Sequence, residues 1–182
     1  MELMAVLVIV GLGLSMIMVS IGQGGPEHQV FKKIEQFLVQ SEFASEHATI
    51  SSEAMGLMVE PPQWQVNAKD IDADDINDIG WRLRWLKMGI RGWEAVPAME
   101  SVSLPPDVQV EMTLGGKRWD WRKLVDKSNP VVAISPSGET TPFVMELRHR
   151  DLRDFVQHLE VGNEGEIVWR EAVEDEKARS KR

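Results

Sequence analysis

Leu3–Ile21 reads LMAVLVIVGLGLSMIMVSI, a run of 19 residues without a charged side chain. At about 1.5 Å per residue, a helix of this length nearly crosses the roughly 30 Å hydrocarbon layer of a bilayer. A helix in a soluble core would show a polar face, and this run shows none. We therefore predict a membrane helix over residues 1–22. We prefer an uncleaved anchor to a signal peptide, because no Lys or Arg precedes Lys32.

The next segment breaks this helix and starts another. Residues 23–26, Gln-Gly-Gly-Pro, oppose helix continuation, and Pro26 can then serve as the first position of a second helix. Apolar and small side chains follow at steps of three and four, which predicts an amphipathic helix over residues 27–52. The stripe, which we expect to pack on a sheet, consists of Val30, Ile34, Phe37, Leu38, Ser41, Ala44 and Ala48.

After residue 52 the period of the apolar pattern changes from 3.6 to 2, which predicts an antiparallel β domain over residues 53–173, with six to eight strands. The clearest element is a hairpin over 108–122 that turns at Gly115-Gly116. This register places Trp119 opposite Met112 and Trp121 opposite Val110. Other strands are predicted at 54–60, 63–66, 81–87, 131–134 and 143–148, with a last hairpin at 155–170.

The chain ends in a charged segment, residues 174–182, which we predict to be disordered because it offers almost no apolar surface to bury. The predicted fold class is therefore α+β, with a long N-terminal helix, membrane-spanning in its first half, packed on an antiparallel sheet domain.

Composition excludes several kinds of site. The 182 residues carry 20 Lys+Arg and 29 Asp+Glu, a formal net charge of −9, which disfavours a surface that follows nucleic acid. The absence of Cys excludes disulfides and thiolate chemistry. Gly115-Gly116-Lys117 lacks the spacing of a phosphate loop, and the four histidines lack metal-ligand spacing. We expect no enzymatic activity, no cofactor and no metal site.

Two features keep an alternative open. Asp70, Asp72 and Asp74 match the first three ligand positions of a calcium loop, but Asp75 stands where glycine is required, so we prefer a solvated acidic loop up to Asp78. Aromatic side chains on the predicted sheet faces either belong to the core, which we prefer, or stack sugars, as in a membrane-anchored sugar-binding module. These are Trp81, Trp85, Trp119 and Trp121.

Glu2 stands at the start of the apolar run. A carboxylate in a membrane helix costs free energy and usually has a partner or a role. From the residues alone, Glu2 either reaches the lipid headgroups from the helix end or pairs with a cation on another subunit.

Residues 136–147, PSGETTPFVMEL, follow the predicted strand 131–134. They resemble the P-x-G-E-x-T-P-F-x-L signature of the type II secretion system protein H (GspH) family of minor pseudopilins, which is related to the FimT and FimU pilins. Residues 1–11 resemble the pilin-like N-terminal helix of that family, and Glu2 matches its single glutamate. The stretch 60–125 matches in strand pattern alone. The motif positions are Pro136, Gly138, Glu139, Thr141, Pro142 and Phe143.

The resemblance implies a pilin-like fold and a minor pseudopilin of Gram-negative type II secretion. It implies a single-pass anchor in the inner membrane, a periplasmic C-terminal domain, and a Glu2 carboxylate that pairs with the terminal amine of a neighbouring subunit. The implied partners are other minor pseudopilins, the major pseudopilin, the inner-membrane assembly platform and the prepilin peptidase acting on the full precursor. Neither nucleic acid nor a small-molecule substrate is expected.

One departure from the family concerns the N-terminus. Family precursors carry a basic leader and then Gly-Phe-Thr-Leu before the glutamate, and the phenylalanine becomes the methylated first residue. This chain starts at Met1, inside that region, so we expect the true start to lie upstream. Such a leader would also resolve an orientation conflict, because Lys32 and Lys33 alone weakly favour a domain on the inside.

The alternative within the same fold is a FimT-type minor pilin of a type IV pilus. Its sequence feature is the set of basic residues in the tail, which could bind DNA, although Glu174, Asp175 and Glu176 stand beside them. The basic residues are Lys177, Arg179, Lys181 and Arg182.

Overall fold

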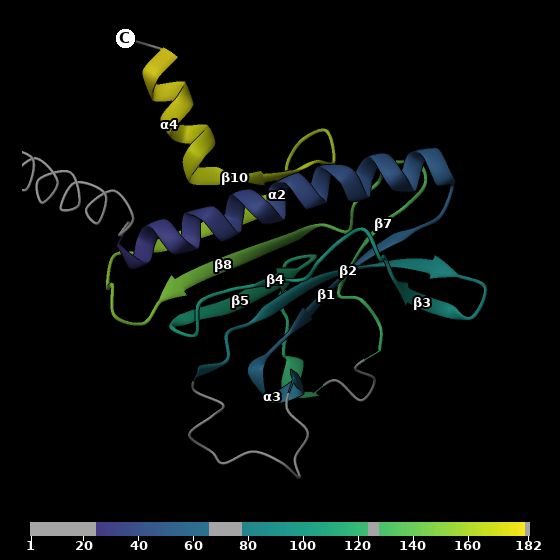
Figure 1. The fold of residues 1–182 in the computed structure, drawn as a ribbon. Coiled ribbons are helices and arrows are strands. Elements are labelled where there is room, and N and C mark those ends of the chain that lie inside the picture. Colours follow the sequence, from purple (N-terminus) through teal and green to yellow (C-terminus); the bar gives the residue numbers. More distant parts are fainter. Residues whose placement is uncertain (1–24, 66–77, 124–127, 181–182) are drawn as a thin grey trace, which may run out of the picture.

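A computed structural model describes residues 25–65, 78–123 and 128–180. In this part of the chain a 26-residue helix, α2 (Pro26–Ser51), lies across two five-stranded antiparallel sheets (Figure 1). This is the α+β arrangement that the sequence predicted, and the helix differs from its predicted bounds by one residue at each end. The described strands number ten rather than six to eight, because the domain divides into two sheets with several short strands.

Each sheet has its own strand order. The first sheet runs β3-β2-β1-β7, with β4 also pairing with β2, and the second runs β10-β9-β8-β5-β6. The first consists of β1 (Met55–Glu60), β2 (Arg82–Gly89), β3 (Gly92–Ala95), β4 (Val102–Ser103) and β7 (Val132–Ile134). The second consists of β5 (Val108–Leu114), β6 (Lys117–Arg118), β8 (Phe143–His149), β9 (Val156–Val161) and β10 (Ile167–Trp169).

Helix α2 buries the stripe that its sequence predicted. Pro26 occupies the first turn, and Ser52, in the left-handed region at φ 55°, ends the helix. The buried positions are Val30, Ile34, Phe37, Ser41, Ala44 and Ala48, while Leu38 is only partly buried. The buried side chains of the C-terminal half, Ser41, Ala44 and Ala48, are small, which lets the helix backbone come close to the sheets there.

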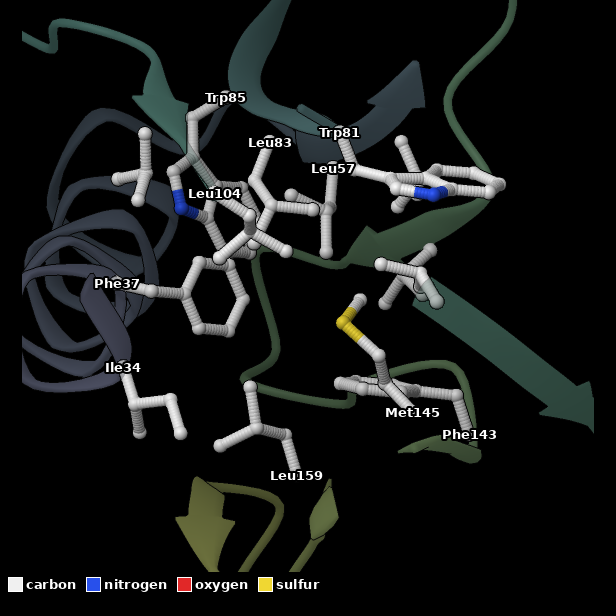
Figure 2. Packing of buried hydrophobic residues seen from close by; sticks show 14 of the residues in the cluster. Ile34, Phe37, Leu57, Trp81, Leu83, Trp85, Leu104, Phe143, Met145 and Leu159 are labelled. Atoms are coloured by element: carbon white, nitrogen blue, oxygen red, sulfur yellow. The ribbon is translucent and has the colours of Figure 1, made fainter. Parts of the chain in front are cut away.

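The core lies between α2 and both sheets. Ile34 and Phe37 point from the helix toward side chains of both sheets, among them Leu83 and Leu159 (Figure 2). The Phe37 ring stacks on Trp85 of β2, with ring centroids 6.1 Å apart and planes at 11°. Full burial of one such side chain contributes about 1.5–3 kcal/mol. The helix and the sheets therefore share a single core.

The predicted strand at 63–66 is wrong for its described residues. Residues 62–65 form a single helical turn, α3 (Pro62–Gln65), in which the Trp64 N–H donates to the Pro61 carbonyl at 3.0 Å. Proline suits the first turn of a helix, because its missing N–H would have no partner there. The Gln65 side chain fixes the turn by donating from Nε2 to the carbonyls of Glu60 (3.2 Å) and Gly80 (2.9 Å).

The predicted hairpin at 108–122 is confirmed near its turn and wrong at its far end. Gly115 and Gly116 both have positive φ, Leu114 pairs with Lys117, and the Trp119 N–H donates to the Met112 carbonyl at 2.8 Å. Trp121, however, starts a 3-10 turn, η2 (Trp121–Lys123). Its ring packs edge-on against Trp81, the residue before β2, with centroids 6.1 Å apart, so this contact prevails over pairing with Val110.

The C-terminal segment also differs from the prediction. Residues 170–180 form helix α4 (Arg170–Ser180), where the sequence predicted disorder from 174 onward. Good helix formers fill this segment, its acidic residues concentrate toward the N-terminal half, and Lys177 and Arg179 stand in the last turn. This charge order is favourable for the helix dipole. Residues 181–182 lie outside the described part.

We expect Phe37→Ala to lower the free energy of unfolding of the full chain by about 3–5 kcal/mol, because the truncation removes the stacked ring and leaves a cavity over Trp85. Denaturant titration in detergent, followed by tryptophan fluorescence, measures the change. Val39→Ala on the exposed side of the same helix should stay within about 0.5 kcal/mol. Equal losses for the two variants would contradict the role given to the Phe37 ring.

Candidate assembly surface

The residue that the sequence selects for assembly, Glu2, lies outside the described residues, and so does the apolar run 3–21. In residues 25–65, 78–123 and 128–180, no helix is both long enough and apolar enough to span a membrane. The membrane helix over 1–22 and the pairing of Glu2 therefore stay predictions.

The motif found in the sequence, residues 136–143, forms the connection from β7 of the first sheet to β8 of the second. It leaves β7 through a turn closed by a 2.9 Å hydrogen bond from the Gly138 N–H to the Ser135 carbonyl. Gly138 has φ 83°, a conformation that favours glycine, which explains this motif position. The Ser135 N–H in turn donates to the Glu139 carbonyl at 2.9 Å.

Two threonines fix the rest of this connection. The Thr140 hydroxyl is buried and donates to the carbonyl of Gly165, in the turn before β10, at 2.7 Å. The Thr141 hydroxyl accepts from the Ala133 N–H at 3.1 Å, and the Pro142 carbonyl accepts from the Gly115 N–H at 3.0 Å. This connection thus joins β7 to the turns of the β5–β6 and β9–β10 hairpins of the second sheet.

The motif residues themselves divide into two groups. Phe143 is buried and starts β8, so its part in the motif is to fill the core. Pro136, Glu139 and Pro142 are exposed, with the Glu139 carboxylate on the surface of the loop. Gly138, Thr141 and Phe143 therefore serve the fold itself. The exposed motif positions are available for contacts with another molecule.

Helix α2 presents an exposed face that carries apolar side chains. Val39 is 67% exposed, Phe43 43% and Ile50 84%, and at 100° per residue all three lie within 40° of one another around the helix. Glu42 and Glu46 are exposed beside them. Scattered apolar residues are normal on a surface, but three on one helix face mark a candidate contact with another chain.

The tryptophans favour the core interpretation over sugar binding. Trp81 and Trp85 are buried. Trp119 and Trp121 are half-buried and border a groove of about 670 Å³. The Arg122 guanidinium lies over the Trp121 ring at 4.5 Å, and Trp64 and Trp81 pack edge-on against that ring. The Trp121 ring thus already has packing partners where a stacked sugar would need an open face.

Helix α4 is anchored to β9 through its first two residues. Arg170 Nε donates to Glu160 Oε1 at 3.1 Å, and this guanidinium lowers the pKa of the Glu160 carboxyl. One oxygen of Glu171 accepts the His158 N–H at 2.9 Å, and the other lies 2.6 Å from the His158 ring Nδ1. Burial raises the pKa of Glu171, but these two hydrogen bonds from His158 outweigh it and lower the pKa.

Neither α4 nor its anchor was predicted from the sequence. The signal that could have revealed the helix is a stretch free of Gly and Pro and rich in Glu, Ala, Lys and Arg. The basic residues proposed for DNA contact divide accordingly: Lys177 and Arg179 are exposed on α4 together with acidic neighbours, and Lys181 and Arg182 lie outside the described part.

The metal expectations concern two parts of the chain. Among the residues that the structure describes, no three His, Asp or Glu side chains gather closely enough to hold a metal ion. Asp70, Asp72, Asp74 and Asp75 lie outside those residues, so the calcium alternative stays a sequence hypothesis.

Comparisons with known proteins confirm the resemblance drawn from the sequence. No family model matches the chain. The type II secretion system protein H of Aeromonas hydrophila is 23% identical over 163 residues, which are 82% of this chain and 79% of that protein. Two structures of the minor pseudopilin EpsH from the type 2 secretion system of Vibrio cholerae have the same fold. The first has a TM-score of 0.56 and is 18% identical, and the match covers 78% of this chain and 94% of that chain. The second has a TM-score of 0.55 and is 19% identical, and the match covers 80% of this chain and 95% of that chain.

We expect Thr140→Val to destabilise the chain by about 1–3 kcal/mol, because it keeps the side-chain shape but leaves the Gly165 carbonyl without its donor. Thermal unfolding measures the loss, and amide exchange should increase most in residues 162–167. Ser137→Ala, in the exposed part of the same loop, is the matched control and should stay within about 0.5 kcal/mol. An unchanged Thr140→Val protein would show that this hydroxyl does not hold the two sheets together.

Acid should loosen the anchor of α4. The folded pKa values of Glu160 and Glu171 lie below their ordinary value of 4.5, so their stabilisation is complete above that pH and is lost as the pH falls through the lowered values. The double variant Glu160→Gln with Glu171→Gln should have a free energy of unfolding about 0.5–1 kcal/mol lower at pH 7. Its stability should also fall less steeply below pH 4.5 than that of the unchanged chain. Unfolding midpoints at pH 7 and pH 3.5 provide the test. Glu174→Gln with Glu176→Gln should leave the decline intact, and the same flattening there would refute the assignment.

Proposed function

We propose that this chain is a minor pseudopilin of a type II secretion system, a structural subunit of the periplasmic filament that drives protein export across the outer membrane. The observation that carries the proposal is the combination of an EpsH-like domain with an apolar run, tipped by an acid, that leads directly into α2. An anchor alone would need the apolar run but not the acid at its end.

The proposed mechanism starts in the membrane. Residues 3–21 hold the subunit in the inner membrane until it is drawn into the filament, where the N-terminal helices bundle and the sheet domains face outward. Glu2 pairs with the terminal amine of a neighbouring subunit, which compensates two charges in an apolar setting and fixes the axial register. Loss of one partner from such a buried pair typically costs about 3–5 kcal/mol.

The segment between the two helices provides the bend that this transfer needs. Residues 22–26, Gly-Gln-Gly-Gly-Pro, let the rod change direction between the membrane and the domain. Beyond them, the exposed face of α2 with Val39, Phe43 and Ile50 extends the apolar contact surface into the periplasm. The partners on this surface are other minor pseudopilins and the major pseudopilin.

Processing and insertion involve further proteins. The full precursor carries a basic leader that the prepilin peptidase removes, and the new N-terminus is methylated. The inner-membrane assembly platform then receives the subunit. The chain acts as a building element rather than as an enzyme, since its motif residues serve the connection between the sheets.

The relatives favour secretion over the pilus alternative. The Aeromonas hydrophila and Vibrio cholerae proteins that this chain resembles are both named for type II secretion, and neither is named as a FimT-type pilin. Helix α4 mixes Glu174, Asp175 and Glu176 with the basic residues that would contact DNA. Carboxylates beside the basic residues repel the phosphates of DNA, which makes this helix a poor DNA site.

We expect Glu2→Ala to reduce secretion at least tenfold in a strain that lacks the chromosomal gene, because the register-fixing ion pair is lost while the domain stays folded. Secreted and cell-associated cargo are measured by immunoblot, and circular dichroism of the purified full chain checks folding. Glu27→Ala, at the exposed start of α2, is the matched control and should secrete normally. Normal secretion by Glu2→Ala would remove the role given to this carboxylate, and a loss of DNA uptake with intact secretion would favour the pilus alternative.

A further inference from the structure

A second groove lies where α2, the turn before β10 and α4 meet. Its volume is about 640 Å³, and its walls are mainly apolar. Helix α2 contributes Leu38 and Val39, β7 contributes Ile134, and α4 contributes Ala172 and Val173. This groove is distinct from the tryptophan groove. It shares Val39 with the exposed face of α2, and it borders Gly165, whose carbonyl accepts from Thr140 of the motif connection.

The edge of β10 forms one side of the groove. Residues 165–169 line it consecutively, although side chains alternate between the two faces of a strand. Five consecutive residues can line one groove when the edge of the strand, with its backbone groups, faces it. Strand β10 is the last strand of its sheet, and within the described residues no further strand pairs with it. Such an edge offers a row of N–H and C=O groups to an incoming strand.

The rim of the groove is acidic. Glu42 and Glu46 on α2 and Glu166 before β10 line it, and no Lys, Arg or His is among the lining residues. One Glu166 oxygen accepts the Glu164 N–H at 2.9 Å, while Glu42 and Glu46 are exposed. An acidic rim around apolar walls is complementary to a segment that carries Lys or Arg beside apolar side chains.

The two ends of the groove limit the length of that segment. At one end the Phe31 ring packs on Trp169, with centroids 5.3 Å apart, and closes the space between α2 and β10. The acidic rim residues Glu46 and Glu166 belong to the other end of the groove, near the turn before β10. The Gly165 N–H and carbonyl and the Glu166 carbonyl are already hydrogen-bonded within the chain, so the free edge is that of β10, Ile167–Trp169, and it matches a short strand of about three residues.

We propose that an extended segment of a neighbouring protein, with apolar side chains flanked by Lys or Arg, adds as a strand to β10 and fills this groove. Main-chain hydrogen bonds to the edge hold the segment, the apolar walls take alternate side chains, and the carboxylates of the rim take the cations. The inference rests on the proposed function in expecting the neighbour among the other subunits of the filament.

The test uses the full chain in secreting cells of its own host. A photo-crosslinking benzoylphenylalanine replaces Ser45, which lines the groove, and adducts are mapped by mass spectrometry. We expect an adduct to a different chain, within a stretch of alternating apolar residues flanked by Lys or Arg. The same probe at Arg153, exposed in the connection between β8 and β9, is the control and should not crosslink to that stretch.

The mapped stretch is then synthesised as a peptide and added to the purified full chain. Strand addition should slow amide exchange at least tenfold at Ile167 and Trp169, whose backbone groups face the free edge because Glu166 and Val168 pair with β9. Charge reversal by Glu42→Lys with Glu46→Lys should weaken peptide binding at least tenfold at low salt, and Glu35→Lys on an exposed part of the same helix should weaken it less than twofold.

Three results would overturn the inference: adducts only to further copies of this chain, adducts to a helical segment, or unchanged exchange in β10. A probe at Val8, in the apolar run, distinguishes a wrong groove inference from a wrong proposed function. Adducts to other pseudopilins from Val8 without any from Ser45 would refute only the groove. Absence of adducts from both positions would refute the filament function as well.

Discussion

The burial of one helix stripe between two sheets is the constraint on which the rest of this domain depends. In the described residues no strand of the first sheet pairs with a strand of the second. Their union rests on the core that α2 covers, where Phe37 stacks on Trp85, and on connections such as residues 135–142, whose hydrogen bonds join β7 to the second sheet. The position of α2 in turn fixes its exposed face, and it places the groove between the helix and β10.

The sequence was most informative where a local pattern and the buried face coincide. The stripe of α2 is visible as steps of three and four, and alternation predicted β5 and its glycine turn, because each buried side chain stands at a position that the period requires. The failures share another cause. Trp121 does not continue its hairpin, because its ring packs against Trp64 and Trp81. Helix α4 is anchored by His158 and Glu160, which no local sequence pattern connects to it.

The candidate site shows the same division. The family motif is visible in the sequence, but its structural effect is not: the Thr141 hydroxyl accepts from the Ala133 N–H of β7, and the Pro142 carbonyl accepts from the Gly115 N–H of a distant turn. The groove could not be predicted, since Ser45, Ile134 and Val173 come from three distant segments. Glu2 illustrates the opposite case: its proposed role rests on a charge beside an apolar run in the sequence, and the described residues begin after it.

The direction of α2 has a mechanical consequence. The helix lies along the sheets, and its N-terminal end is the end joined to the apolar run (Figure 1). A pull on that end is directed along the interface, so the side chains from Val30 to Ala48 resist sliding in parallel instead of peeling away one after another. Such a pull would load the domain in shear, the geometry in which many weak contacts share a force, and this suits the transfer from bilayer to filament proposed above.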